Sequence, residues 1–81
     1  MSKETLRKQL DKTFGDNPYI LRTDPRRQQL DGLSAAVIAN FDSEKTGPAG
    51  MFYVGRKAAY PKDNYITWLV NRITAKGEPH A

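Results

Sequence analysis

Residues 51–69 read MFYVGRKAAYPKDNYITWL. A short apolar run, a basic Gly55-Arg56-Lys57 tip and a second run ending at Tyr60 are typical of a two-stranded hairpin. Such a hairpin is only marginally stable alone in water, so its inner side chains need a surface to lie on. We expect the aromatic helix that follows to provide that surface and to hold the tip away from the body.

The helix after the hairpin begins at Asp63, or slightly earlier with Pro61 in its first turn, and ends near Lys76-Gly77. Its predicted apolar face consists of Tyr65, Trp68, Leu69 and Ile73. This spacing favours a core position for Trp68 over a base-stacking role.

Two shorter helices separated by glycine are predicted upstream of the hairpin. The first has Thr23 or Asp24 as its cap, Pro25 in its first turn and Gly32 just past its end. The second spans residues 35–42 after the Ser34 cap, with an apolar face of Val37, Ile38 and Phe41. A helix, a tight glycine turn and a second helix outline a helix-turn-helix.

An N-terminal amphipathic helix and turn are predicted over residues 1–18. Ser2 can cap it, apolar residues recur every four positions up to Phe14, and Gly15 ends the pattern. This helix either covers the core or forms a small protein-contact surface. Residues 19–21 (YIL) are either a strand or a packed linker, and Asp42 and Glu44 are interpreted as solvated loop residues.

Composition favours one small domain with a polyanionic partner. The chain has 81 residues, 38% hydrophobic and 27% charged, and a net charge of +4. It has no cysteine and no apolar run long enough to cross a bilayer, and we expect no signal peptide, so we expect a cytoplasmic, nucleoid-associated protein without a membrane partner. His80 is the only histidine, which argues against a metal site. No catalytic constellation is apparent, and neither an enzyme nor a cofactor is expected.

Residues 20–73 resemble the winged helix-turn-helix excisionases, or recombination directionality factors, and the related prophage and MerR-type regulators. The elements that carry the resemblance are Gly47-Pro48, Tyr53, Val54-Gly55-Arg56, Tyr60, Tyr65 and Trp68-Leu69. Upstream, RRQQLDGLSAAVIANFD (residues 26–42) is similar to the family's first helix, turn and recognition helix. The chain departs from the family in its polar first helix and in Ala35, Ala36 and Val37, where the family often places a base-reading arginine or threonine.

The resemblance implies a small α+β winged helix-turn-helix domain over residues 19–76 with a two-stranded wing; the N-terminal helix is an extra element, and residues 77–81 are expected to be a frayed tail. The resemblance also implies binding to double-stranded DNA, DNA bending and assistance to an integrase in excision. Because the alanine-rich start of the recognition helix offers no hydrogen bonds to bases, we further expect protomers to bind side by side and to associate with one another on DNA. A promoter regulator of the same fold and a protein-interaction module with an acidic partner are the alternatives.

The candidate DNA-binding residues are Arg26, Arg27, Ser34, Ala35, Ala36, Asn40, Lys45, Arg56 and Lys57. The arginine pair either flanks a phosphate or solvates its helix, and Asn40 either bonds adenine or forms a local hydrogen bond. Because alanine offers only a methyl group, hydrogen bonding to bases is expected from Ser34 and Asn40, with the rest from phosphate contacts and DNA shape.

Overall fold

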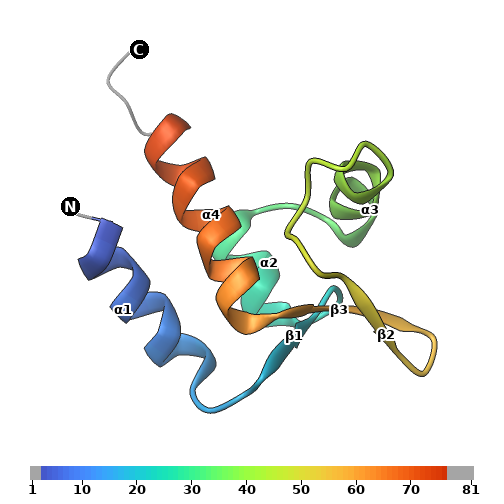
Figure 1. Cartoon of the computed structure of the whole chain (residues 1–81), viewed down its shortest axis with the longest axis horizontal. Helices are drawn as coiled ribbons and strands as arrows, with labels where there is room; N and C mark the ends of the chain where they lie inside the picture. The colour runs from blue at the N-terminus through green and yellow to red at the C-terminus, as the bar shows by residue number, and fades with distance from the viewer. Residues whose placement is uncertain (1–2, 77–81) are drawn as a thin grey trace.

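The computed structural model describes residues 3–76, with side chains for residues 3–73. This part of the chain forms a small α+β fold with four helices and a three-stranded antiparallel sheet (Figure 1). The elements are α1 (Lys3–Phe14), β1 (Tyr19–Leu21), α2 (Pro25–Asp31), α3 (Ala35–Ser43), β2 (Phe52–Val54), β3 (Lys57–Pro61) and α4 (Lys62–Lys76). The predicted Ser2 cap, Gly77 stop and tail at 77–81 lie outside the described residues.

The sheet has the order β1-β3-β2. Tyr60 of the central strand pairs with Ile20 of β1, and Ala58 pairs with Tyr53 of β2. Residues 19–21, which the sequence left open as a strand or a packed linker, therefore form the third strand of the sheet, and the predicted two-stranded hairpin is β2–β3. Pairing on both edges of β3 buries Ile20 and Tyr60, which gives the hairpin the support that a two-stranded ribbon lacks.

A two-residue turn joins β2 to β3, as predicted. Val54 pairs with Lys57 across it, and Gly55 adopts a φ of +64° whereas Arg56 has no positive φ. This combination fits a type II′ turn, whose first central position favours glycine. The turn leaves the Arg56 and Lys57 side chains exposed at the tip.

The helix boundaries around α2 and α3 confirm the predicted caps. The Asp24 carboxylate accepts from the Arg26 N–H, and Gly32 ends α2 in the left-handed region at a φ of +69°. The Ser34 Oγ accepts from the Val37 N–H at 3.2 Å. The connection between the two helices is therefore short and fixed at both ends.

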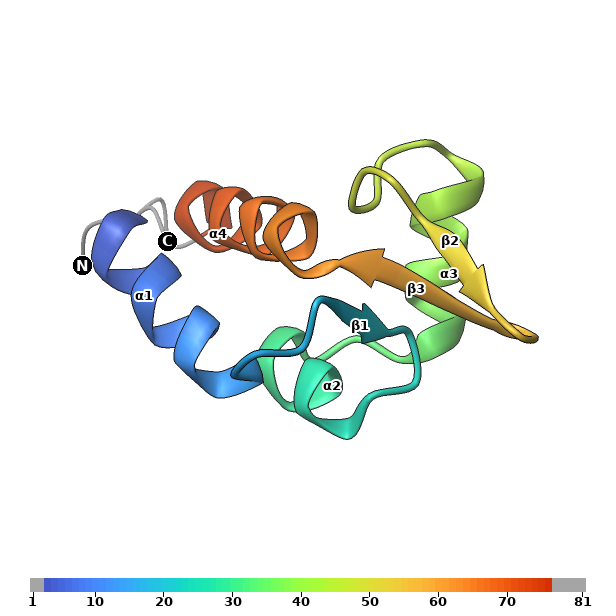
Figure 2. The same ribbon diagram turned by 60° about the horizontal axis from the view of Figure 1, so that its bottom comes forward.

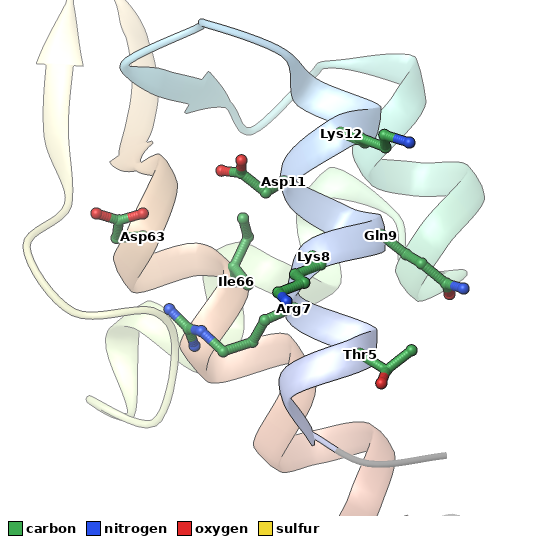
Figure 3. Close-up of a pocket in the computed structure, with 8 residues that line it drawn as sticks. All are labelled: Thr5, Arg7, Lys8, Gln9, Asp11, Lys12, Asp63 and Ile66. Carbon is green, nitrogen blue, oxygen red and sulfur yellow. The ribbon is translucent and has the colours of Figure 1, made fainter.

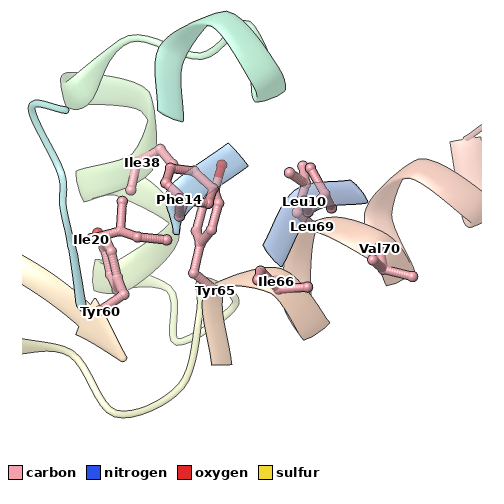
Figure 4. Close-up of a cluster of buried hydrophobic side chains, with 9 residues drawn as sticks. All are labelled: Leu10, Phe14, Ile20, Ile38, Tyr60, Tyr65, Ile66, Leu69 and Val70. Carbon is pink, nitrogen blue, oxygen red and sulfur yellow. The ribbon is translucent and has the colours of Figure 1, made fainter. Parts of the chain in front are cut away.

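A single buried cluster joins α1, the sheet, α3 and α4 (Figure 4). Its members are Leu10, Phe14, Ile20, Ile38, Tyr60, Tyr65, Ile66, Leu69 and Val70. The rings of Phe14 and Tyr65 meet edge to face, with centroids 5.8 Å apart. Because Leu10 and Phe14 are buried in this cluster, α1 covers the core.

Two of the predicted apolar faces each include one residue that is exposed in the structure. Val37 is 38% exposed on α3, where Ile38 alone is fully buried. Ile73 is 37% exposed, although it shares the α4 stripe of Leu69 and Val70, because the core ends before the following turn. Periodicity identifies the side of a helix that faces the core, but the extent of the neighbouring elements decides where burial stops.

Trp68 packs against the core from the side. Its ring meets Phe41 at a centroid distance of 6.0 Å, and the Arg72 guanidinium lies 5.6 Å from its centre. Its Nε1–H donates to the Thr46 carbonyl at 2.8 Å, which ties the loop after α3 to α4. These contacts favour the structural interpretation of Trp68.

A buried ionic network holds the α2–α3 connection against the rest of the fold. The Arg27 guanidinium donates from Nη1 to both Asp31 carboxylate oxygens, at 2.8 and 2.7 Å, and from Nε and Nη2 to the Arg22 and Leu33 carbonyls. Asp31 also accepts from the Leu33 N–H and, at 2.9 Å, from the Tyr65 hydroxyl. The network therefore links α2, its turn and α4.

A second network joins α3 to the sheet. The Asp42 carboxylate accepts from the Arg22 guanidinium and from the Tyr60 hydroxyl, both at 2.6 Å. Asp42 belongs to α3, so its interpretation as a solvated loop residue is wrong. Its two partners, from the end of β1 and from β3, fix α3 relative to the sheet.

These contacts predict alkaline instability. Burial, followed by the hydrogen bond to Asp42, raises the pKa of Tyr60 to about 12, above the ordinary tyrosine value. Between pH ~10 and ~12 the unfolded chain releases this proton while the folded state retains it, so the free energy of unfolding should fall with rising pH, by up to about 1.4 kcal/mol per pH unit. Urea titrations across this range should show a shallower pH dependence for Tyr60→Phe. Equal slopes for the two proteins would contradict the expected role of Tyr60.

Candidate nucleic-acid interface

The helix α3 and the β2–β3 hairpin lie at the same end of the molecule, and α1 lies at the other (Figures 1 and 2). We call the exposed residues of α3 and of the hairpin, together with Glu44 and Lys45 directly after α3, the α3–hairpin surface. It consists of Ala36, Val37, Asn40, Ser43, Glu44, Lys45, Phe52, Tyr53, Val54, Gly55, Arg56 and Lys57.

The α3 part of this surface is the face opposite Ile38. At 100° per residue, Ala36, Asn40 and Ser43 point away from the core, with Val37 and Glu44 along one edge of the same face. Ala35 lies partly toward the core and is half-buried. The Ser34 Oγ is occupied as the helix cap, so of Ser34 and Asn40 only Asn40 has its whole side chain available for a base edge.

The hairpin contributes two cations and two exposed aromatic rings, of which Phe52 packs edge to face on Tyr19. Arg56 and Lys57 are exposed at the tip, as predicted. Tyr53, which is 64% exposed, was not among the predicted site residues. The strand register places it on the same face of the sheet as Ala58 and Tyr60, and it is the middle residue of β2. Its place two residues before the Gly55-Arg56 turn was the available signal.

The exposed cations of the α3–hairpin surface have no acidic partner in the part of the chain that the structure describes. Within the described residues, Lys45, Arg56 and Lys57 make no ion pair or side-chain hydrogen bond. Elsewhere an aspartate neutralises each of four cations, in the pairs Arg22–Asp42, Arg26–Asp24, Arg27–Asp31 and Lys62–Asp11. Free positive charge is therefore available at the hairpin tip and at the end of α3, where Glu44 is the one exposed carboxylate of the surface.

The prediction that Arg27 contacts DNA is wrong. Its side chain is 1% exposed, and its donors are used by Asp31 and by backbone carbonyls, so it cannot reach a phosphate. Arg26 has a side chain that is 42% exposed, but it bonds Asp24, donates to the Thr13 carbonyl and stacks on Phe14 at 5.3 Å. Arg26 therefore lies at the α1–α2 junction, apart from the α3–hairpin surface.

A hollow of about 590 Å³ lies between α1 and the first turns of α4, away from the α3–hairpin surface (Figure 3). In Figure 3 Asp11 projects from α1 close to Ile66, and Asp63 lies at the start of α4. Asp11 pairs with Lys62, and Arg7 donates to the Thr67 hydroxyl at 2.8 Å. The mixed charges of this hollow give it no continuous positive surface for a polyanion.

Searches of protein families, curated proteins and solved structures find no match to this chain. Within residues 3–76, no helix combines the length and apolar character needed to cross a bilayer. The same part of the chain contains no group of three or more acidic, histidine or cysteine residues placed to hold a metal ion.

Proposed function

We propose that this protein binds double-stranded DNA as a winged helix-turn-helix domain, with α2 and α3 as the helix-turn-helix and β2–β3 as the wing. The main support for this proposal is the position of Arg56 and Lys57, which lie unpaired at the tip of the hairpin. The hairpin lies at the same end of the molecule as α3 (Figure 1). Unpaired cations gain affinity for phosphates by releasing condensed counterions.

The dimensions of α3 support this assignment. An α-helix with its side chains is about 10–12 Å across, which a major groove about 12 Å wide can admit, and the nine residues of α3 give it a length of about 13 Å to lie in the groove. With α3 in the major groove, the wing tip would contact the adjacent backbone or minor groove. Tyr53 on the wing and Lys45 at the end of α3 would add sugar or phosphate contacts.

The resemblance to excisionases supports a more specific role. We propose that several protomers bind side by side near a mobile element's attachment region, bend the DNA and assist an integrase in excision. Regulation of a promoter by the same fold is the alternative role, and an interaction module for an acidic protein is the alternative from another class.

The composition of α3 favours the clustered mode. Ala36 and Val37 offer no hydrogen bonds, so a single protomer has few groups that distinguish bases and should bind weakly. Neighbouring protomers would raise the effective concentration, and bending would add specificity at bases that no side chain contacts.

Gel shifts on fragments with one, two and three copies of a selected site test this role. We expect the occupancy of the DNA to rise more steeply with protein concentration on fragments that carry more sites. The gel mobility of the complex should change when the sites are circularly permuted along the probe. Tight binding to one isolated site without a permutation effect would favour the promoter regulator and would contradict the architectural role.

A further inference from the structure

Val37 is an unexpectedly exposed side chain on the face of α3 that the proposed function places in the major groove. The sequence assigns it to the core, yet it is 38% exposed beside Ala36, while Ile38 takes the buried position. An isolated exposed valine is common on protein surfaces. What distinguishes Val37 is the chemistry of its neighbours on that face.

The exposed face of α3 presents no cation to the bases. Along its length it carries the methyl group of Ala36, the isopropyl group of Val37, the Asn40 amide and, at its C-terminal end, the Ser43 hydroxyl and the Glu44 carboxylate. A guanine contact normally uses arginine or lysine, and neither is present on this face. Val37 lies in the N-terminal half of this face, whereas the Glu44 carboxylate stands at its C-terminal end, next to Lys45.

The major-groove edges of the four base pairs expose one apolar group, the C5-methyl of thymine. From these observations, and resting on the proposed function, we propose that Val37 contacts thymine C5-methyl groups and that this contact sets part of the sequence preference. A β-branched side chain in a helix is held largely in one rotamer, so its methyl groups are ordered before binding.

Asn40 adds to this preference for A·T base pairs. It lies three residues after Val37, so the two side chains are neighbours on the helix surface, about 5–6 Å apart at Cβ. An asparagine can bond adenine through N6 and N7. Together the two side chains select A·T pairs at one or two adjacent positions of the site.

The experiment removes single methyl groups from the DNA. A duplex is first selected from a randomised pool with the wild-type protein, and each thymine is then replaced in turn by deoxyuridine, which lacks only the C5-methyl. At one or two positions we expect the replacement to weaken wild-type binding by about 3- to 5-fold, the effect of one buried methyl group. For those positions, Val37→Ala should bind the thymine duplex and the deoxyuridine duplex with equal affinity.

Two control variants make the result specific. Ile73→Ala removes a comparably exposed β-branched side chain from α4 and should retain the wild-type response to deoxyuridine. Asn40→Ala should also retain it, while losing preference for adenine. Melting curves check that each variant is folded, which is expected because all three side chains are exposed.

The outcomes separate the inference from the proposed function. Sequence-selective binding with no response to deoxyuridine, or with the same response in Val37→Ala, would overturn the role of Val37 and leave DNA binding standing. A wild-type protein that retains no duplex from the pool would overturn both.

Discussion

Replacing Arg27 by methionine is expected to unfold a large fraction of the protein. The change leaves the buried Asp31 carboxylate without its guanidinium partner, and it leaves the Arg22 and Leu33 carbonyls without a donor. Breaking a buried ion pair on one side costs about 3–5 kcal/mol. A chain of 81 residues has a total stability of about 4–12 kcal/mol, so the loss is a large part of the whole.

The adjacent arginine provides a matched control. Arg26→Met removes the same charge one position earlier, but from a half-exposed ion pair with Asp24 that contributes about 1 kcal/mol or less. In thermal melts followed by circular dichroism, Arg27→Met should melt about 10–30 °C lower than Arg26→Met. Equal melting temperatures would show that the buried network does not stabilise the fold.

Replacing both Arg56 and Lys57 by alanine is expected to weaken binding to every duplex. If each side chain contacts a phosphate, the double variant should lose about 10- to 100-fold in affinity at low salt. The slope of log affinity against log salt should become shallower by about 1 to 2 units. Because both side chains are exposed, the variant should melt like the wild type.

A second double variant distinguishes the wing from positive charge in general. Lys8 and Lys12 are exposed on α1, at the other end of the molecule, and Lys8→Ala/Lys12→Ala removes the same net charge. Anisotropy titrations should show a clearly smaller loss for this control. Equal losses in the two double variants would contradict the assignment of the hairpin as the DNA-contacting wing.

Local signals were sufficient to predict several elements. Gly55, the Ser34 cap and the Pro25 and Gly32 boundaries each depend on backbone geometry within a few residues, and each is confirmed. Residues 19–21 were left open because a three-residue strand has almost no pattern of its own and its partner, β3, lies about 40 positions later.

The candidate site was harder to predict because exposure depends on tertiary packing. Arg27 has an aspartate four residues later, a spacing that permits an ion pair, but its burial requires Tyr65 and the turn carbonyls to converge on the same place. Val37 reads as a core residue in a helical pattern, but it lies about 100° around α3 from the fully buried Ile38 and is exposed. Tyr53 carries part of the family resemblance, and its exposure depends on which elements cover that face of the sheet. The cations Lys45, Arg56 and Lys57 were identifiable from the sequence because loop tips are normally solvated.

The most direct test of the central claim is the affinity of the wild-type protein for a short labelled duplex across a salt series, with and without an unlabelled competitor. Three unpaired cations on the α3–hairpin surface give an expected slope of about −3 in log affinity against log salt for one protomer. Binding to a duplex that the protein has selected should also persist in the presence of an unlabelled duplex of scrambled sequence. Absence of binding at low salt, or a slope near zero, would contradict DNA binding and favour an interaction module for an acidic protein.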